Sequence, residues 1–273
     1  MLKKGIILIA TGAPGYGNMA YNLAQTIKQA EQVPVALVHD DTSLFHLTPG
    51  QLEVFDHLIP VTTAGFATKL NLDQLTPFTH TLYCDVDMLW LGRKPSELFD
   101  QLQGIPFTAI KEGCSDKPNN KYYFWADPTE IKKAYGIDWL PMCRSEVLYF
   151  EKGTKVFATA RKLKPATQLK TIRMFGDNIP DELYFNIACG QTNTRLVDGW
   201  MPAYWSRLNG EIMPPLAELY KNYFMLSFGS NTASGTMKKA YDNIMTVCCN
   251  KLRLPYLFKL KSKKEWAPGR LKI

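Results

Sequence analysis

Two aspartates separated by one residue, Asp85 and Asp87, are the residues whose types and spacing most directly suggest chemistry. Apolar segments lie on both sides, at Thr81–Cys84 and Met88–Leu91. Alternate side chains of a strand share one face, so both carboxylates can point the same way. Such oxygen ligands suit Mg²⁺ or Mn²⁺ shared with the phosphates of a ligand, and burying both charges without a cation would be costly. We therefore expect a metal site; a solvated acidic turn is the alternative.

A second candidate site is the glycine-rich turn Thr11–Gly17 near the start of the chain. The apolar run Gly5–Ala10 before it predicts a buried parallel strand, and Asn18 after it is a candidate N-cap for a helix to about Gln29. A strand end, a glycine turn and a helix start together form a common nucleotide-binding crevice. Tyr16 could stack on a base there, although an ordinary strand–helix turn is equally compatible with the pattern.

The segment Leu82–Gly92, with sequence LYCDVDMLWLG, resembles the Asp-x-Asp segment of GT-A glycosyltransferases. The nearest group is the retaining one that includes glycogenin and bacterial lipopolysaccharide galactosyltransferases. The resemblance covers residues 1–245 in element order and is specific only around the two aspartates. It implies an α/β fold, a GT-A-like Rossmann-type mixed sheet flanked by helices in a single domain. The expected domain is 1–249, followed by a basic extension, 250–273.

The resemblance also implies a function. Such enzymes bind a nucleotide-sugar, here expected to be a UDP-sugar, through Mn²⁺ or Mg²⁺ and transfer the sugar to a glycan or lipid-linked acceptor, with retention. The implied site residues are, for catalysis, Asp181 and Glu182; for donor binding, Thr11, Gly12, Tyr16, Lys69, Asp85 and Lys238; on the acceptor side, Glu146 and Trp125; and for the metal, Asp85 and Asp87.

The chain departs from the family pattern at two places. Glu146 stands where a glycine is usual, which offers a carboxylate to a sugar hydroxyl. Ser227-Phe-Gly229 replaces His-x-Gly, and the four histidines all precede residue 81. Either Ser227, Asn231 or water is then the third metal ligand, or the metal is weakly held. Lys238 or its neighbour Lys239 would support the phosphates.

Several of these residues have a purely structural alternative. Lys69 could be a solvated lysine of the helix expected at 66–75. Asp181, at the start of the helix expected at 181–190, is favoured there by the helix dipole whatever the function. Trp125 ends an aromatic cluster, 122–125, which could stack on a sugar or form a small core under a long loop.

Apolar runs and turn residues predict the remaining elements. The expected strands are Val35–His39, Leu58–Pro60, Pro106–Ile110 and Phe224–Gly229. The expected helices are 96–102, capped by Ser96, and 154–164, while 112–143 is irregular and 176–180 is a turn.

Composition sets limits on the class of protein. The 273 residues carry a net charge of +7 and contain no apolar run near the roughly 20 residues of a membrane span. The apolar run near the N-terminus is too short for a signal peptide, and six cysteines without Cys-x-x-Cys spacing are typical of reduced thiols in a cytoplasmic protein.

The C-terminal segment Lys251–Ile273 is strongly basic, with eight Lys or Arg and one Glu. Its basic residues alternate with Leu, Tyr, Phe and Trp, which suits peripheral contact with an anionic membrane. A solvated or partly packed terminus is the alternative. Nucleic acid is disfavoured because the basic run is short and no nucleic-acid motif accompanies it.

Two other functions remain compatible with the sequence. A sugar nucleotidyltransferase would share the sheet and the acidic metal site, but it normally carries a basic residue in the loop that here reads TGAPGYG. A non-catalytic protein that binds sugar-nucleotide or glycan would explain the missing histidine.

Overall fold

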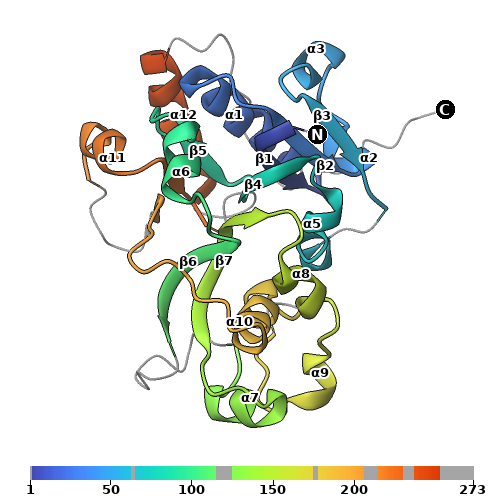
Figure 1. The fold of residues 1–273 in the computed structure, drawn as a ribbon. Coiled ribbons are helices and arrows are strands. Elements are labelled where there is room, and N and C mark those ends of the chain that lie inside the picture. The colour runs from blue at the N-terminus through green and yellow to red at the C-terminus, as the bar shows by residue number, and fades with distance from the viewer. Residues whose placement is uncertain are drawn as a thin grey trace, which may run out of the picture. The chain divides into compact units, whose positions relative to one another are not determined.

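The computed structural model describes residues 2–62, 65–114, 125–174, 178–205, 214–229 and 237–252 (Figure 1). In these ranges, nine strands and the helices between them make a mixed α/β fold. The strands are β1 (Leu2–Ala10), β2 (Val35–His39), β3 (His57–Pro60), β4 (Phe78–Cys84), β5 (Met88–Trp90), β6 (Phe107–Cys114), β7 (Pro141–Glu151), β8 (Ala203–Trp205) and β9 (Met225–Ser227).

The described helices vary from single turns to long amphipathic segments. They are α1 (Pro14–Ala30), α2 (Asp41–Leu44), α3 (Pro49–Leu52), α4 (Phe66–Lys69), α5 (Leu72–Leu75), α6 (Pro95–Gln101), α7 (Pro128–Tyr135), α8 (Lys155–Ala160), α9 (Pro165–Gln168), α10 (Asp181–Gln191), α11 (Leu216–Asn222) and α12 (Met237–Leu252). No helix in these ranges is long and apolar enough to cross a membrane.

Six strands form one mixed sheet in the order β3-β2-β1-β4-β7-β6. β1, β2 and β3 pair in parallel, whereas β6 and β7 pair antiparallel with register shifts along the ribbon. A small second sheet has the order β5-β9-β8. The expected mixed sheet flanked by helices is confirmed, and so are the strands expected from the runs GIILIA and VALVH.

The chain divides into two compact units. The first unit comprises residues 1–5, 63–83 and 102–201, and the second comprises 6–62, 84–101 and 202–273. In the first unit α10 packs on β7 and α8. Three fully buried rings pack together there at ring-centroid distances of 5.5–5.8 Å: Phe107 stacks on Phe185, and both meet Phe157 edge to face.

In the second unit α1 packs against α2 and β5, and β2 is buried along its whole length. This full burial explains why β2 reads as an unbroken apolar run in the sequence. Tyr241 of α12 is fully buried, and its hydroxyl accepts a hydrogen bond from Asn22 of α1 at 3.0 Å, which ties the last described helix to this unit.

Two helix starts differ from the prediction for the same physical reason. Asn18 is not an N-cap but lies inside α1, which begins at Pro14, and Ser96 lies inside α6, which begins at Pro95. Proline is favoured in the first turn of a helix because its missing N–H would have no partner there.

Three other segments also differ. The helix expected over 66–75 is two short helices, α4 and α5, and the one expected over 154–164 ends at Ala160. The region 112–143 is not all irregular, because β6 extends to Cys114 and α7 follows Asp127. Asp127 caps α7 by accepting from the N–H groups of Thr129 and Glu130, and Gly136 ends it in a left-handed conformation.

Candidate functional site

Asp85 and Asp87 lie at the end of β4 in the segment that joins it to β5. Both are half-buried, while Val86 between them is buried. The carboxylates therefore lie on the accessible side of the segment. The backbone carbonyl of Asp87 accepts a hydrogen bond from the Phe228 N–H at 3.0 Å, which fixes the segment against the end of β9.

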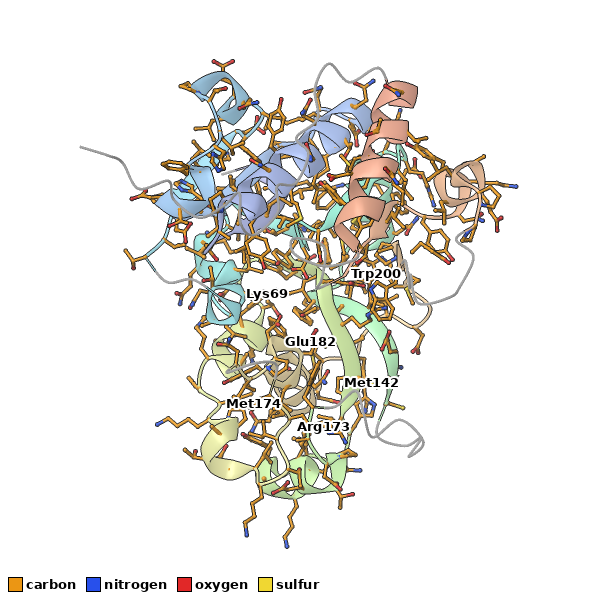
Figure 2. The ribbon with its side chains drawn as sticks, turned by 180° about the vertical axis from the view of Figure 1, so that it is seen from behind. Lys69, Met142, Arg173, Met174, Glu182 and Trp200 are labelled. Atoms are coloured by element: carbon orange, nitrogen blue, oxygen red, sulfur yellow. The ribbon has the colours of Figure 1, made fainter. Side chains whose placement is uncertain are left out.

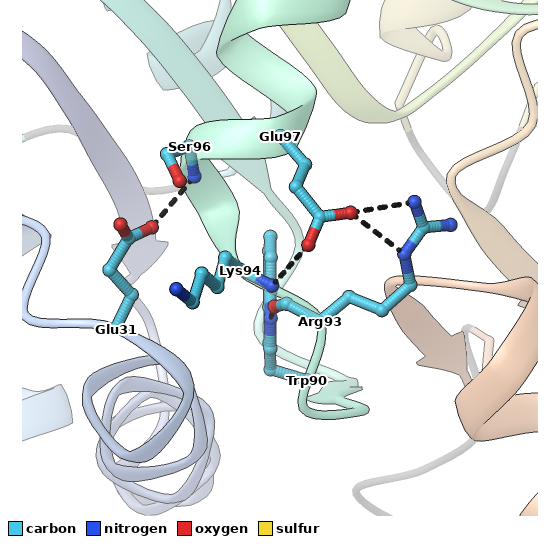
Figure 3. A network of polar contacts seen from close by, with 6 residues as sticks. All are labelled: Glu31, Trp90, Arg93, Lys94, Ser96 and Glu97. Atoms are coloured by element: carbon cyan, nitrogen blue, oxygen red, sulfur yellow. Dashed lines mark hydrogen bonds and ion pairs between the residues drawn. The ribbon is translucent and has the colours of Figure 1, made fainter.

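The strand that follows the aspartates is anchored on both sides. Met88 pairs with Ser227 of β9, and the Trp90 N–H donates to the Thr26 hydroxyl of α1 at 3.2 Å. The indole N–H of Trp90 donates to the Arg93 carbonyl at 2.6 Å, and both residues are drawn in Figure 3. The Arg93 guanidinium lies 3.9 Å from the ring centroid of Phe224. This packing holds the aspartate pair in one backbone conformation.

The polar network beyond Trp90 fixes the start of α6 (Figure 3). Glu97 accepts from the Arg93 guanidinium at 2.8 Å, and the Ser96 N–H donates to Glu31 at the end of α1 at 2.8 Å. Burial of Glu97 is slight, and the hydrogen bond from Arg93 lowers the pKa of its carboxyl. The C-terminal side of the segment that carries the aspartates is therefore anchored within the second unit.

Asp40, which follows β2, fixes the glycine-rich turn through hydrogen bonds of its carboxylate. One carboxylate oxygen accepts from the Gly12 N–H at 2.6 Å, and the other accepts from the Ser43 N–H at 2.8 Å. Gly12 has a φ of 88°, which favours glycine. A Cβ on Gly17 would lie 1.9 Å from the Ser43 carbonyl oxygen, so glycine is needed there for close approach of α1 to α2.

Tyr16, in the first turn of α1, is part of the glycine-rich turn and interacts electrostatically with the aspartate pair. Burial raises the pKa of its phenol, and the negative charges of Asp87 and Asp85 raise it further. The residue remains 38% exposed. Three of the predicted site residues therefore form one group in the second unit, and Thr11 and Gly12 lie in the adjoining turn.

This group fits a divalent cation of the Mg²⁺ or Mn²⁺ type. Its protein ligands would be the two accessible carboxylates, and such ions commonly take one or two carboxylates and complete their shell with phosphate oxygens and water. Within the described ranges no group of three His, Cys, Asp or Glu side chains is placed to hold a metal. Ser227 is buried at the end of β9, and Asn231 lies outside the described residues.

A second group of predicted residues lies in the first unit. Lys69 ends α4, and its ammonium lies 3.0 Å from the carboxylate of Asp181, the first residue of α10. Both side chains are buried, with 8% and 2% exposure. Glu182 follows in the same turn and is half-buried. Figure 2 shows Lys69 and Glu182 close together, with Met142 of β7 farther along.

The remaining turns of α10 are tied to β7. Asn186 accepts a hydrogen bond from the Cys143 N–H at 2.9 Å. Burial raises the pKa of the Cys143 thiol, and the neighbouring Cys189, Glu182 and Asp181 raise it further, so this cysteine is a neutral core residue.

The two residues predicted for the acceptor side have clear structural contacts. Glu146 forms an ion pair with Arg144 at 3.5 Å, and Arg144 pairs with Glu112 at 3.0 Å. Trp125 has a φ of 59°, packs against the core around α7, and accepts a hydrogen bond at its carbonyl from the Arg173 N–H at 2.7 Å.

Lys238 and Lys239 belong to α12, but their side chains lie outside the described part of the chain. Two residues that act in these groups were missed by the sequence interpretation, Asp40 and Ser145. The sequence did carry a signal for Asp40, because an aspartate three residues before Ser43 is a helix-capping pattern. Ser145, which contacts Lys69, gave no comparable signal.

Comparison with solved structures identifies the fold. The galactosyltransferase LgtC, in complex with donor and acceptor sugar analogues, is similar over 90% of this chain and 95% of that chain, with a TM-score of 0.57 and 12% identity. The chain has the GT-A glycosyltransferase fold. The bifunctional glycosyltransferase WbbM matches 84% of this chain and 46% of its own, with a TM-score of 0.53 and 11% identity.

Mouse xyloside xylosyltransferase 1 is similar over 85% of this chain and 99% of that chain, with a TM-score of 0.50 and 12% identity. No protein-family model matches the chain, and no curated protein sequence matches it. The GT-A likeness is therefore one of architecture and not of overall sequence.

Proposed function

We propose that the protein is a glycosyltransferase that moves a sugar from a UDP-sugar to a glycan or lipid-linked acceptor, with retention of the anomeric configuration. The observation that carries this proposal is the group formed by Asp85, Asp87 and Tyr16. Two accessible carboxylates at a strand end, beside an aromatic side chain of a glycine-rich turn, suit a metal-bound nucleotide diphosphate.

The residues of the second unit would bind the nucleotide. The ring of Tyr16 would stack on the base, and backbone groups of the turn at Thr11 and Gly12 would contact the nucleotide. Asp85 and Asp87 would hold Mn²⁺ or Mg²⁺, which when bound neutralises charge on the leaving nucleotide diphosphate. Lys238 or Lys239 is proposed to support the phosphates.

The residues of the first unit would act on the sugars. Asp181 and Glu182 present carboxylates at the start of α10 and are proposed to face the donor sugar. Glu146 and Trp125 are proposed for the acceptor side, because carboxylates accept hydrogen bonds from sugar hydroxyls and aromatic rings stack on sugar faces.

A panel of nucleotide-sugars tests this function. We expect slow hydrolysis of one UDP-sugar with Mn²⁺, faster consumption with an acceptor, and no turnover with EDTA. Binding without turnover for every donor and acceptor would favour a non-catalytic protein of the same fold. Formation of a nucleotide-sugar from sugar phosphate and nucleoside triphosphate would favour a nucleotidyltransferase.

A further inference from the structure

Lys69 is surrounded by acceptors that belong to the protein itself. Its ammonium lies 3.0 Å from the Asp181 carboxylate and 3.3 Å from both the carbonyl and the hydroxyl oxygen of Ser145. The ring centroid of Tyr83 lies 5.1 Å away, within the range of a cation–π contact. The ammonium donates hydrogen bonds to the two Ser145 oxygens and forms an ion pair with the Asp181 carboxylate.

Asp181 in turn needs a cation. Its side chain is 2% exposed, and a buried carboxylate without a counterion is strongly disfavoured. The start of α10 contributes only a partial positive charge. The Lys69 ammonium, 3.0 Å away and equally buried, offsets the burial of the Asp181 charge and restricts where the carboxylate can point.

We propose that Lys69 is the internal counterion that positions Asp181, in place of the donor-binding residue that the family resemblance implied, and that Ser145 is a positioning residue that holds Lys69. The inference rests on the proposed function, in which Asp181 acts on the donor sugar. A lysine that binds phosphate has to turn its ammonium toward the ligand, whereas the buried ammonium of Lys69 forms an ion pair with Asp181 and hydrogen bonds with Ser145.

Ser145 is the sharper test because its loss leaves both charges in place. Ser145→Ala removes the hydroxyl but keeps the backbone carbonyl, so Lys69 loses one of three oxygens. We expect kcat for UDP-sugar hydrolysis to fall roughly tenfold, with KM little changed. A change of that size corresponds to the free energy of one hydrogen bond to a charged group. Affinity for UDP with Mn²⁺ should stay within about twofold of the parent. Thr81→Val, which removes another fully buried hydroxyl of the first unit, should leave kcat unchanged.

Lys69→Met should lower kcat more than Ser145→Ala and also lower the melting temperature, because it leaves Asp181 buried without its cation. The double variant Lys69→Met/Asp181→Asn should recover much of that melting temperature, since neither charge is then buried. This recovery measures the pairing of the two side chains without relying on activity.

The outcomes separate this inference from the proposed function. A tenfold or greater loss of UDP affinity in Lys69→Met, with kcat largely kept, would make Lys69 a phosphate ligand and overturn the inference. So would a double variant that melts no higher than Lys69→Met. If the parent turns over no nucleotide-sugar, the proposed function fails, while the melting temperatures still decide whether Lys69 and Asp181 act as a pair.

Discussion

Substitution of Asp181 has different expected effects depending on whether the residue is catalytic or purely structural. We expect Asp181→Asn to lower kcat for UDP-sugar turnover roughly a hundredfold while the donor KM changes only a few-fold, because an interaction made mainly in the transition state shows that pattern. Steady-state kinetics with a melting curve on the same preparation provide the measurement. A lower melting temperature with unchanged kcat would show that the residue serves only the start of α10.

The pKa of the Tyr16 phenol reports on the charge of the aspartate pair. Burial and the charges of Asp87 and Asp85 raise the pKa of its phenol. A cation bound to those carboxylates cancels their charge, so we expect Mn²⁺ or Mg²⁺ to lower this pKa toward its ordinary value. Tyrosine ring-carbon NMR during an alkaline titration with Mg²⁺, using Tyr16→Phe to assign the signal, measures the change. A Tyr16 pKa that does not respond to saturating Mg²⁺ would place the cation elsewhere.

At the residue scale, the sequence reveals site residues whose signal is local. Asp85 and Asp87 stand one residue apart between apolar runs, so their place at a strand end can be predicted. The tether from Gly12 to Asp40 spans 28 positions, and the contact of Lys69 with Ser145 spans 76. Such pairs depend on the tertiary fold, and no pattern within a short window indicates them.

At the scale of elements, the close packing of α1 on α2 is the most sensitive feature of the glycine-rich turn. A Cβ on Gly17 would meet the Ser43 carbonyl at 1.9 Å, a backbone atom that cannot rotate away. We expect Gly17→Ala to lower the free energy of unfolding by about 2 kcal/mol and to weaken UDP binding. Gly50→Ala is the matched control, because nothing lies within 4 Å of its added Cβ. Equal stability of the two variants in urea unfolding would contradict this packing.

The elements show where sequence patterns succeed and fail. β1 and β2 are predictable because burial in a parallel sheet, complete for β2 and extending over Gly5–Leu8 of β1, gives unbroken apolar runs. The start of α1 was misplaced because Asn18 is a good capping residue, whereas Pro14 begins the helix. α7 was not predicted although Asp127, Pro128 and Gly136 mark its two ends, because the aromatic cluster before it is equally typical of a long loop.

At the scale of the whole molecule, the basic segment after α12 is proposed to hold the protein at an anionic membrane surface. α12 ends at Leu252, so a chain ending there keeps the helix that carries the buried Tyr241. We expect the full chain to co-sediment with anionic vesicles, to bind neutral vesicles poorly, and to lose binding as salt is raised. The shortened chain should not bind. Equal sedimentation of both chains would remove the segment from any role in membrane contact.

The whole proposal depends on a metal-bridged nucleotide at Asp85 and Asp87, and calorimetry of UDP binding tests this most directly. The parent should bind UDP with Mn²⁺ and lose that affinity in EDTA. Asp87→Ala should weaken binding by more than roughly tenfold, because one of two carboxylate ligands is lost, while the fold is kept. Asp100→Ala, which removes an exposed carboxylate of α6, should bind like the parent. Binding by Asp87→Ala as tight as that of the parent with Mn²⁺ present would contradict the assignment.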